Sequence, residues 1–569
     1  MSTLNNVADT LRQHARMRPD QPALIVPDGQ GWTSISYRAL NTRVDRFARG
    51  FEQKGLRRGD RVLFLVKPGI DFYSALFGLF RMGAIPVLMD PGMGLKNLLG
   101  CIEQAQPRAT LAIPIVHLVR QLKRKAFKSA DLHITAGTRW LWGGPTLEQC
   151  LAEGEEPYES GDVRSEEDEG FIAFTSGSTG PPKGVSYVQR MFLNQSRMLG
   201  QQYGMGPDWT TVECFAAFVI FDLALGMTVV IPDMDLSKPA TADPANVVRA
   251  IEEHKARTAF ASPVVWQNVA RWCQKEGKNL HSLEQVLTAG APIPADLHRR
   301  FRTLLADGVD LKTPYGATEA LPVVTIGSAE VLGDTWERTA RGEGTCVGTT
   351  FPGVTVEIAR ITDEPMPEWS AELSMEPGEV GEITIFAPIV SPEYKDRPDA
   401  NAMAKVLRDG AIGHRMGDLG YRDDQGRIWF CGRKSHALWV DPQRTSAPGV
   451  RADGLVPAVP IEGVFNEHDK VLRTALVGVG ESGSQIPVLW VELEKDQTWT
   501  GDLAAEILAL ADGTRWAGVV ERVLHHEGFP VDPRHNSKIK REELRVQAEA
   551  RCADLLAAKS EPPAEARSA

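Results

Sequence analysis

Cysteine is scarce in this sequence and is not clustered. The seven cysteines of the 569-residue chain lie far apart, no Cys-x-x-Cys pair is present, and the histidines do not have the spacing of a zinc site. An odd number of isolated cysteines argues against a disulfide framework and is typical of a reducing compartment. We therefore expect a cytoplasmic protein without a structural zinc site.

An excess of positive charge is also lacking. With 63 Lys and Arg against 74 Asp and Glu, the formal net charge is −11 and the isoelectric point is about 5.7. Such a charge opposes a nucleic-acid or anionic-membrane footprint over the whole molecule, although it is compatible with local basic patches. The first ten residues lack the basic segment and apolar stretch of a signal peptide, so none is expected. Chemistry on small molecules becomes the default function, with no nucleic-acid partner.

Long hydrophobic runs are rare, and one of them needs a membrane test. Phe215–Pro232 is 18 residues long with a single charge, Asp222, which approaches the length of a spanning helix. A lone Asp in the middle of a bilayer is costly, Gly226 interrupts the run, and Thr228–Ile231 has the pattern of a short buried strand. The run is therefore predicted to lie in the core, and no transmembrane segment is expected, while a peripheral contact with lipid stays open.

The order of strand-like and helix-like segments predicts an α/β fold. Arg61–Val66 has the pattern of a buried strand, Phe72–Met82 is apolar at helical spacing, and Ile85–Met89 is again strand-like. With 43% hydrophobic and 24% charged residues, the chain can bury a sizeable core. Such alternation is typical of largely parallel sheets covered by helices. It recurs at 245–254, 258–261, 263–274 and 285–288.

The texture of the sequence changes twice, and both changes predict domain limits. From Gly342 onward, strand patterns such as Val354–Ala359 and Gly381–Phe386 alternate with Pro/Gly-rich turns, which indicates a β-rich subdomain at about 342–431. After Cys431 the chain passes through a Pro/Gly/Asp-rich stretch before regular patterns return. We expect a large N-terminal domain of helix-covered sheets (1–431), a hinge (432–436), a small mobile α+β C-terminal domain (437–552) and a disordered tail (553–569).

The strongest local motif is Thr175-Ser-Gly-Ser-Thr-Gly-Pro-Pro-Lys-Gly184, which follows the strand-like Phe171–Phe174. Glycines let the backbone approach an anion, hydroxyls add donors and Lys183 adds positive charge, so the segment suits a polyphosphate. It lacks the Walker spacing, and by composition alone a solvated loop is the alternative. A second glycine motif, Gly478–Gly483, leads into a strand pattern and therefore predicts a turn rather than a dinucleotide site.

Further motifs follow this loop in order, and together they resemble the adenylate-forming superfamily, which includes acyl-CoA synthetases, luciferases and peptide-synthetase adenylation domains. The matches extend from residue 175 to residue 540. The resemblance implies the fold of these enzymes and activation of an acid by ATP. The other motifs are Ala289-Gly-Ala-Pro292, Tyr315-Gly-Ala-Thr-Glu319, Val347-Gly348 with Pro352-Gly353, Gly378-Glu-Val-Gly-Glu-Ile383, Gly417-Asp-Leu-Gly420, Gly432-Arg433 and Asn536-Ser-Lys-Ile539.

The resemblance also implies a role for each matching residue. Tyr315 would stack on adenine, Asp418 would accept hydrogen bonds from the ribose with Arg433 nearby, and Glu319 would hold Mg²⁺, which prefers oxygen ligands. Lys538 would bridge the carboxylate and the α-phosphate. From the residues alone, the alternatives are a core tyrosine, a turn aspartate, a surface glutamate and a solvated basic segment. The other implied nucleotide-binding residues are Thr175, which is also a second candidate metal contact, Ser176, Gly177, Ser178, Thr179, Lys183, Gly290, Ala291, Gly316 and Thr318.

The chain departs from typical thioester-forming members near the predicted hinge. Ser435 stands where an Asp or Lys is usual, and the stretch from Gly432 to Ile461 exceeds the usual spacing by roughly eleven residues. The hairpin glycine that lines the pantetheine path in those members has no identifiable counterpart here. Asn536-Ser-Lys-Ile539 also replaces the commoner Thr-Gly-Lys-Ile, with the lysine retained. These departures put the use of coenzyme A in question.

Together with the strings at 221–235 and 436–465, the departures make the chain similar to the β-lactone synthetase family of bacterial long-chain olefin biosynthesis. The resemblance implies that ATP and Mg²⁺ serve to adenylate a long-chain 2-alkyl-3-hydroxy acid, whose own 3-hydroxyl then expels AMP. It also implies partners from that pathway: a thiolase-like condensing enzyme, a reductase and a lactone-decarboxylating α/β-hydrolase.

Several alternatives stay open from the sequence. A long-chain acyl-CoA ligase or a fatty-acyl-AMP ligase would share the motifs. A non-catalytic nucleotide-binding scaffold is disfavoured because Lys538, Glu319 and Asp418 are retained. Phe221 and Leu225 are candidates for an acyl pocket, with core packing as an equal alternative.

Overall fold

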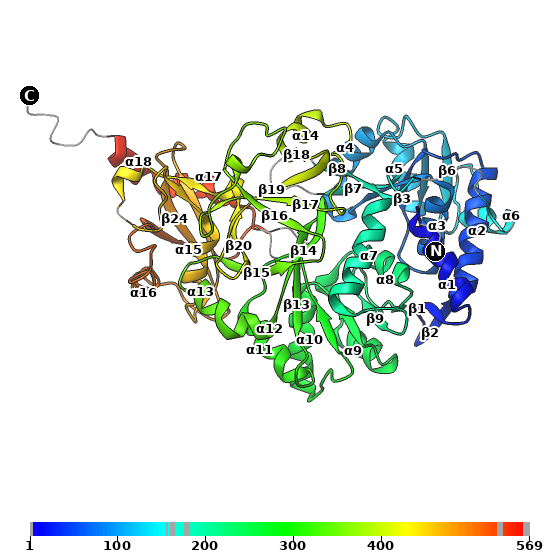
Figure 1. The fold of residues 1–569 in the computed structure, drawn as a ribbon, viewed down its shortest axis with the longest axis horizontal. Coiled ribbons are helices and arrows are strands. Elements are labelled where there is room, and N and C mark those ends of the chain that lie inside the picture. Colours follow the sequence, from blue (N-terminus) through cyan, green and yellow to red (C-terminus); the bar gives the residue numbers. More distant parts are fainter. Residues whose placement is uncertain are drawn as a thin grey trace, which may run out of the picture.

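The computed structural model describes residues 4–154, 157–159, 165–175, 182–445, 447–531 and 539–560. Figure 1 shows an elongated molecule, with the blue and cyan N-terminal elements at one end, the green elements in the middle and the orange C-terminal elements at the other end. The elements build an α/β fold with a large N-terminal domain and a smaller α+β C-terminal domain, which confirms the predicted fold class. The predicted limits at 431 and 437 stay predictions.

A six-stranded sheet occupies the N-terminal end, in the order β6-β5-β3-β4-β7-β8. Its strands are parallel except β8, which runs antiparallel to β7. The strands are β3 (Arg61–Leu65), β4 (Ile85–Met89), β5 (Ala109–Ala112), β6 (Leu132–Thr135), β7 (Glu169–Thr175) and β8 (Lys183–Val188). The helices of this part are α1 (Val7–Met17), α2 (Tyr37–Gln53), α3 (Ile70–Met82), α4 (Leu95–Ala105), α5 (Pro114–Leu122), α6 (Leu147–Glu153), α7 (Gln189–Tyr203) and α8 (Val219–Leu225).

A fourteen-stranded sheet runs through the middle of the molecule, and its parallel part is covered by helices α9 and α10. Trp266 of α10 is fully buried against this part, and truncating such a tryptophan to alanine costs about 3–5 kcal/mol. The parallel strands are β1 (Pro22–Asp28), β9 (Thr210–Glu213), β10 (Thr228–Val230), β11 (Thr258–Phe260) and β12 (Gln285–Leu287), with β2 (Gly31–Ser36) antiparallel at the edge. The helices are α9 (Pro244–Glu253), α10 (Pro263–Glu276), α11 (Ala295–Leu304), α12 (Ser328–Glu330), η3 (Val331–Thr335), α13 (Trp336–Ala340) and α14 (Pro398–Ala404).

The predicted β-rich stretch after Gly342 is present, but its strands do not form a sheet of their own. Strand β15 pairs with β14, so the antiparallel strands continue the fourteen-stranded sheet through backbone hydrogen bonds. Sequence patterns show strands but not their partners, because pairing depends on residues far away in the chain. The strands are β13 (Leu311–Ala317), β14 (Ala320–Gly327), β15 (Thr345–Thr350), β16 (Thr355–Ala359), β17 (Gly381–Phe386), β18 (Lys405–Arg408), β19 (Ala411–Arg422) and β20 (Ile428–Arg433).

The C-terminal domain is built on a three-stranded sheet, β23-β24-β25. The Gly478–Gly483 motif forms the turn between antiparallel β23 and β24, as predicted. Helix α18 forms at the start of the stretch for which a disordered tail is expected, and the predicted domain limits stay predictions. The elements are β21 (Leu438–Trp439), β22 (Leu455–Val456), α15 (Ala458–Phe465), β23 (Val471–Val479), β24 (Ile486–Leu493), α16 (Gly501–Ala509), β25 (Arg522–His525), α17 (Arg541–Arg551) and α18 (Ala553–Ser560).

The hydrophobic run at 215–232 folds as two short elements, α8 and β10. Gly226 adopts a left-handed conformation with φ 82° and ends α8, so the run is broken where the sequence predicts. Both elements are largely buried, which confirms their place in the core. Among the described residues, no helix combines the length and the apolar character needed to cross a bilayer.

Candidate active site

A cavity of about 3110 Å³ opens along the carboxyl ends of the parallel strands β9, β11 and β12 and continues to the C-terminal domain. Residues that follow these strands line it: Phe215 after β9, Ser262 after β11, and Gly290 with Ala291 after β12. Ligands of open α/β sheets bind at this edge. A drug-sized ligand needs about 300–1,000 Å³, so this cavity has room for a nucleotide together with a long acyl group.

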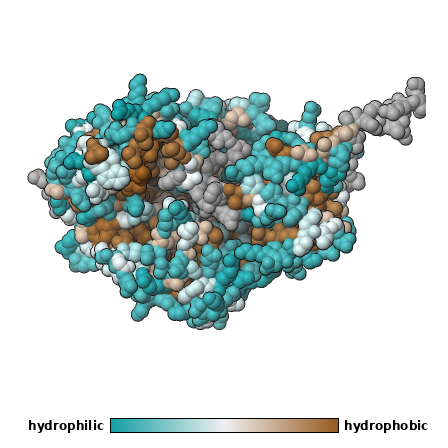
Figure 2. All heavy atoms as spheres, turned by 180° about the vertical axis from the view of Figure 1, so that it is seen from behind, coloured by the Kyte–Doolittle hydropathy of each residue, from teal (hydrophilic) through white to brown (hydrophobic). Residues whose placement is uncertain are grey.

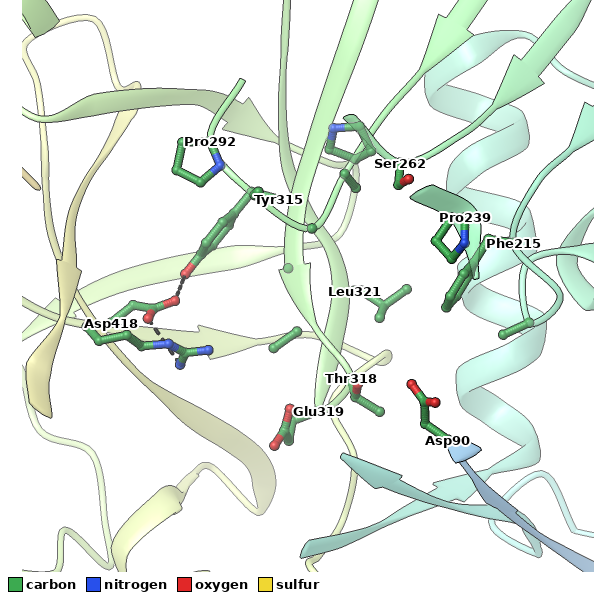
Figure 3. A pocket seen from close by; sticks show the side chains of 18 of the residues that line it. Asp90, Phe215, Pro239, Ser262, Pro292, Tyr315, Thr318, Glu319, Leu321 and Asp418 are labelled. Carbon is green, nitrogen blue, oxygen red and sulfur yellow. Dashed lines mark hydrogen bonds and ion pairs between the residues drawn. The ribbon is translucent and has the colours of Figure 1, made fainter. Parts of the chain in front are cut away.

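The β13–β14 hairpin carries four of the predicted site residues into the cavity. Tyr315 and Gly316 lie at the end of β13, and Thr318 and Glu319 form the turn. At Gly316 a Cβ atom would come within 2.8 Å of the carbonyl oxygen of Ala320, so only glycine fits this narrow hairpin. Figure 3 shows Thr318 and Glu319 at the turn, between Tyr315 and Asp418 on one side and the apolar Leu321 and Phe215 on the other.

Two contacts from a distant segment hold Glu319. The hydroxyl of Tyr394 donates to Glu319 Oε1 at 2.6 Å, and the backbone N–H of Ser391 donates to the Glu319 carbonyl oxygen at 2.8 Å. Tyr394 is buried, so its donor has a fixed direction. These contacts orient the Glu319 carboxylate before any ligand binds, as is typical of carboxylates that coordinate metal ions. Sequence reasoning missed Tyr394, because it lies 75 residues from Glu319 and carries no motif of its own.

Two lysines lie near this tyrosine. Lys183 Nζ lies 4.9 Å and Lys405 Nζ lies 5.5 Å from the centre of the Tyr394 ring. Burial lowers the pKa of Lys405 to about 7, and the nearby Glu319 opposes this shift. Lys405 also donates to the carbonyl oxygen of Ser391 at 2.7 Å. Positive groups thus gather beside Glu319, which favours an anionic ligand, and the phosphate contact of Lys183 stays a prediction.

Asp418, Arg433 and Tyr315 form a second predicted group. Asp418 on β19 and Arg433 at the end of β20 face each other across the strands, with Arg433 Nη1 3.1 Å from Asp418 Oδ1. Tyr315 Oη donates to Asp418 Oδ2 at 2.5 Å (Figure 3). Burial raises the pKa of Asp418, while Arg433 and Tyr315 oppose this. Within the described structure Asp418 Oδ1 receives no hydrogen bond, so the site offers a buried acceptor that fits a ribose hydroxyl.

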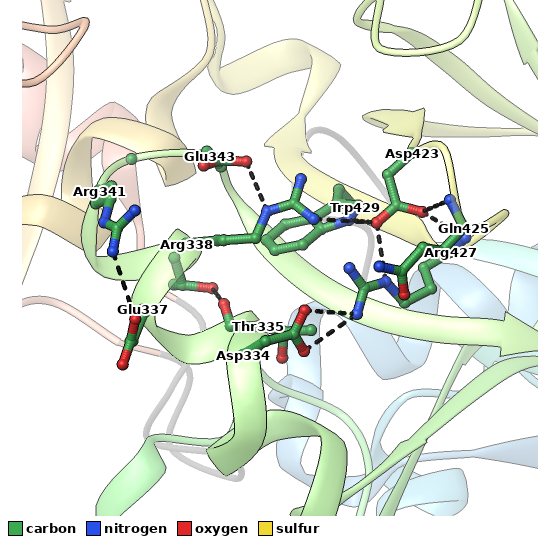
Figure 4. A network of polar contacts seen from close by, with 12 residues as sticks. Asp334, Thr335, Glu337, Arg338, Arg341, Glu343, Asp423, Gln425, Arg427 and Trp429 are labelled. Carbon is green, nitrogen blue, oxygen red and sulfur yellow. Dashed lines mark hydrogen bonds and ion pairs between the residues drawn. The ribbon is translucent and has the colours of Figure 1, made fainter.

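A buried ionic network fixes the strands that carry this group (Figure 4). Asp423 Oδ2, after β19, accepts from Arg427 Nε at 2.8 Å, from Trp429 Nε1 at 2.9 Å and from Arg338 Nη1 at 3.3 Å. Arg338 in turn donates to Glu343 at 2.8 Å and lies over the Trp429 ring. Because β20 runs from this network to Arg433, the network anchors the strand that leads to the predicted hinge.

Part of the predicted site lies outside the described residues. This applies to Ser176, Gly177, Ser178 and Thr179 of the phosphate loop and to Lys538. Thr175 ends β7, directly paired with Lys183 of β8. The residues that follow position 538, Ile539–Arg541, line the cavity.

Aromatic side chains line the other end of the cavity. Phe215, Phe218 and Phe221 line it, and Phe215 is 43% exposed. Leu225 packs against the core cluster that contains Met198, and its place in an acyl pocket stays a prediction.

A buried pair of carboxyl groups lies in this apolar wall. Glu213 at the end of β9 and Asp222 in α8 both line the cavity and are 2% and 7% exposed. Burial raises the pKa of Glu213, and Asp222 raises it further; burial also raises the pKa of Asp222, to about 7. Glu213 Oε1 accepts the backbone N–H of Phe215 at 2.8 Å. The pair therefore shares protons near neutral pH and does not carry two full charges.

Residues 11–395 match the family described as AMP-binding enzyme. The chain therefore belongs to this family, and the predicted superfamily is confirmed. It is an enzyme of the AMP-forming ligase class.

Two relatives are similar to the chain over nearly their whole length. The olefin beta-lactone synthetase of Stenotrophomonas maltophilia (strain K279a) is 41% identical over 558 residues, covering 96% of this chain and 98% of the relative. That of Xanthomonas campestris pv. campestris is 40% identical over 563 residues with the same coverage. The solved structure of o-succinylbenzoate coenzyme A synthetase from Bacillus subtilis, in complex with ATP and magnesium ion, covers 94% of this chain and 98% of its own, with a TM-score of 0.72 at 18% identity, and so shares the fold.

Proposed function

We propose that the chain is an ATP-dependent β-lactone synthetase of olefin biosynthesis that acts on a long-chain 2-alkyl-3-hydroxy acid. The observation that carries the proposal is the near-full-length similarity, at 41% and 40% identity, to two olefin beta-lactone synthetases. The cavity supports it, because nucleotide-type residues gather at one end and aromatic side chains at the other. The products are a β-lactone, AMP and pyrophosphate.

In the first step the carboxylate of the acid attacks the α-phosphorus of ATP. The bond to the β-phosphate breaks, and an acyl-adenylate and pyrophosphate form. Tyr315 and Asp418 hold the adenosine, Lys183 contacts the phosphates, and Lys538 neutralises charge that develops between carboxylate and α-phosphate. The roles of Lys538 and of the loop at 176–179 rest on the motif resemblance.

Mg²⁺ accompanies ATP in this proposal. Glu319 fits such a cation, because its carboxylate lines the cavity and is held in one orientation by Tyr394. Among the described residues no three His, Cys, Asp or Glu side chains come together as a metal cluster. Glu319 would hold the cation together with ATP, and Mg²⁺ usually keeps phosphate and water oxygens as its other ligands. When bound, the cation neutralises phosphate charge. Thr175 stays a predicted second contact.

In the second step the 3-hydroxyl attacks the acyl carbon, the bond to AMP breaks and the hydroxyl proton is released. The four-membered ring is strained, so this closure gains less than the best intramolecular reactions, whose effective molarities reach about 10⁵–10⁸ M. AMP as a good leaving group supplies the rest. The aromatic wall formed by Phe215, Phe218 and Phe221 keeps water from the adenylate.

The proposal also places the chain in the cytoplasm between other enzymes of the pathway. A thiolase-like condensing enzyme and a reductase supply the 3-hydroxy acid. An α/β-hydrolase consumes the lactone. An assembly with these enzymes is part of the prediction.

The test is to mix the protein with ATP, Mg²⁺ and a long-chain 2-alkyl-3-hydroxy acid, with and without coenzyme A. Products are identified by NMR without heating, because β-lactones lose CO₂. A β-lactone that forms equally in both mixtures is expected. A coenzyme A thioester without lactone would show a long-chain acyl-CoA ligase instead. Release of acyl-AMP as the end product would show a fatty-acyl-AMP ligase.

A further inference from the structure

Exposed hydrophobic side chains concentrate in one region of the molecule. Twelve large hydrophobic side chains are exposed among the described residues, and six of them lie between Leu95 and Leu141. On α5, Leu122 is 73% exposed, and in the loop that follows β6, Leu141 is fully exposed. Leaving such side chains in water is unfavourable, and a contiguous patch of them marks an interaction site. The other four are Leu95 at the start of α4, Ile115 and Leu118 on α5, and Trp140 in the loop beside Leu141.

The same region is basic, although the whole chain is acidic. Residues 114–142 contain six Lys and Arg against one Asp, a local charge of 6 − 1 = +5, whereas the chain carries −11. The one acid, Asp131, pairs outside the segment: its Oδ1 lies 3.7 Å from Nε of Arg108. Within the described part of the chain, none of the six cations has an acidic partner at ion-pair distance. The cations are Arg120, Lys123, Arg124, Lys125, Lys128 and Arg139.

Helix α5 and the loop at 137–144 form one continuous surface, here called the α5 surface. The ring of His117, on the inner face of α5, lies 5.4 Å from the ring of Trp142 in the loop, and Trp142 lies 5.4 Å from Trp140. Strand β6 beneath them is the edge of the six-stranded sheet, so the surface caps that edge.

The α5 surface borders the acyl end of the cavity. Ile113, Ile115 and Val116 line the cavity, and Ile115 is at the same time 51% exposed. A side chain that reaches both makes the hydrophobic surface continuous with the cavity wall. Figure 2 shows hydrophobic surface beside the central hollow, in the half of the molecule opposite the C-terminal tail.

We propose that the α5 surface docks on an anionic lipid bilayer and sets the mouth of the acyl cavity against the lipid. Exposed leucines and a tryptophan on helix α5 and the loop at 137–144 lie beside lysines and arginines, four of which follow α5 directly at 123–128 and are counted here as part of the α5 surface. Such a combination is the pattern of an interfacial segment. Tryptophan favours the headgroup region, and the unpaired cations match anionic headgroups. The proposal rests on the proposed function in one respect: an acid with two long alkyl chains resides in the bilayer, so a docked cavity receives it directly.

The test measures binding of the full-length chain to sedimented vesicles. Vesicles of phosphatidylcholine mixed with phosphatidylglycerol are expected to carry the protein down at low salt, and vesicles of phosphatidylcholine alone are expected to carry down much less. The double variant Lys123→Glu/Arg124→Glu is expected to bind the anionic vesicles at least about tenfold more weakly. The matched control Lys275→Glu/Arg302→Glu changes the net charge equally on α10 and α11 and is expected to bind like the unchanged chain.

A second pair of variants separates the hydrophobic contribution. Leu122→Ser/Leu141→Ser is expected to weaken vesicle binding several-fold. The binding that remains is expected to be lost at high salt. Met17→Ser, at a side chain 64% exposed on α1, is the control and is expected to have no effect. None of these residues lines the cavity, so pyrophosphate release with a detergent-solubilised acid is expected to stay unchanged in all variants.

Vesicle binding needs neither ATP nor acid, so its outcome is independent of the proposed reaction. Absence of binding to anionic vesicles, or equal loss in the matched control, would overturn the proposal. If the α5 variants instead change the oligomeric state in sedimentation velocity and leave vesicle binding intact, the surface is a contact between copies of this chain. Retention by an acidic partner protein with no vesicle binding would likewise replace the lipid surface by a protein.

Discussion

Buried carboxyl groups lie at both ends of the cavity, but their neighbours differ. At the nucleotide end Asp418 has Arg433 and Tyr315 as partners, and Glu319 has Tyr394. At the acyl end Glu213 faces another acid and, among the described residues, has no ion pair. The neighbours therefore favour charged carboxylates at one end, and they keep the other end close to neutral beside aromatic side chains.

The largest expected effect tests whether the nucleotide end performs the chemistry. Lys538→Ala is expected to slow adenylation by at least ~10²-fold, the loss typical of removing one group that stabilises developing charge in the transition state. Pyrophosphate release with the 3-hydroxy acid measures it. Lys540→Ala, two residues along in the same basic segment, is the control and is expected to cost far less. Equal effects in both variants would contradict the specific role of Lys538.

A smaller effect is expected at the ribose acceptor. Asp418→Asn removes a charged acceptor and leaves Arg433 without its partner, so we expect KM for ATP to rise about ten- to a hundredfold, the range for a hydrogen bond to a charged group. Tyr315→Phe keeps the ring and removes only the hydroxyl that donates to Asp418, and it is expected to change KM less. Steady-state kinetics with varied ATP distinguishes them. An Asp418→Asn enzyme with unchanged KM would show that this end does not read ribose.

A smaller effect on activity is expected when Glu319 keeps its charge but loses the hydrogen bond that orients its carboxylate. Tyr394→Phe removes the donor to Glu319 Oε1 but keeps the ring between Lys183 and Lys405. We expect the Mg²⁺ concentration for half-maximal activity to rise about five-fold, as for one hydrogen bond of about 1 kcal/mol. Titration with Mg²⁺ at saturating ATP measures it. A change in maximal rate alone, at an unchanged Mg²⁺ requirement, would contradict a positioning role.

At the acyl end the expected effect concerns stability. The pKa of Asp222 is raised to about 7, so the folded chain holds a proton that the unfolded chain releases above about 4. This contribution is present at low pH and is lost as the pH rises through about 7. Asp222→Asn, which stays neutral, is therefore expected to gain at least about 1 kcal/mol relative to the unchanged chain between pH 5 and pH 8, since one pKa unit equals about 1.4 kcal/mol. Thermal unfolding at both pH values measures this.

The controls for this prediction lie in the same pair. Glu213→Gln removes the other acid and is expected to weaken the pH dependence in a similar way, because the two groups titrate together. A surface acid such as Asp399, whose side chain is 68% exposed, is expected to leave the profile between pH 5 and pH 8 unchanged on substitution by Asn. A profile of Asp222→Asn that parallels the unchanged chain would contradict the buried neutral pair.

Local patterns predicted the framework well. The strand, helix and strand expected at 61–89 appear as β3, α3 and β4, and the break at Gly226 is where the sequence places it. Periodicity and glycine chemistry are local, so they can be read without knowing the fold. The join of β15 to β14 could not be read in this way, because a strand pattern does not name its partner.

For the candidate site, the motifs point to residues that the structure brings together, whereas residues outside the motifs carry no signal in the sequence. Tyr315, Asp418 and Arg433 come together as the motif order implies. Tyr394 reaches Glu319 from a segment 75 residues away and carries no motif that could have indicated it. The hydrophobic string around Phe221 and Leu225 does not by itself separate cavity wall from core. Asp222 was visible as a single charge in a hydrophobic run, but its partner Glu213 was not.

The most direct test follows the oxygen atoms of the acid into the two products, AMP and the lactone. The acid is prepared with both carboxylate oxygens as ¹⁸O and is converted with ATP and Mg²⁺, and AMP and lactone are analysed by mass spectrometry. Activation of the carboxylate predicts one ¹⁸O in AMP and one in the lactone carbonyl, with an unlabelled ring oxygen from the 3-hydroxyl. A lactone that retains both ¹⁸O atoms, beside unlabelled AMP, would show that the hydroxyl is activated instead and would contradict the account.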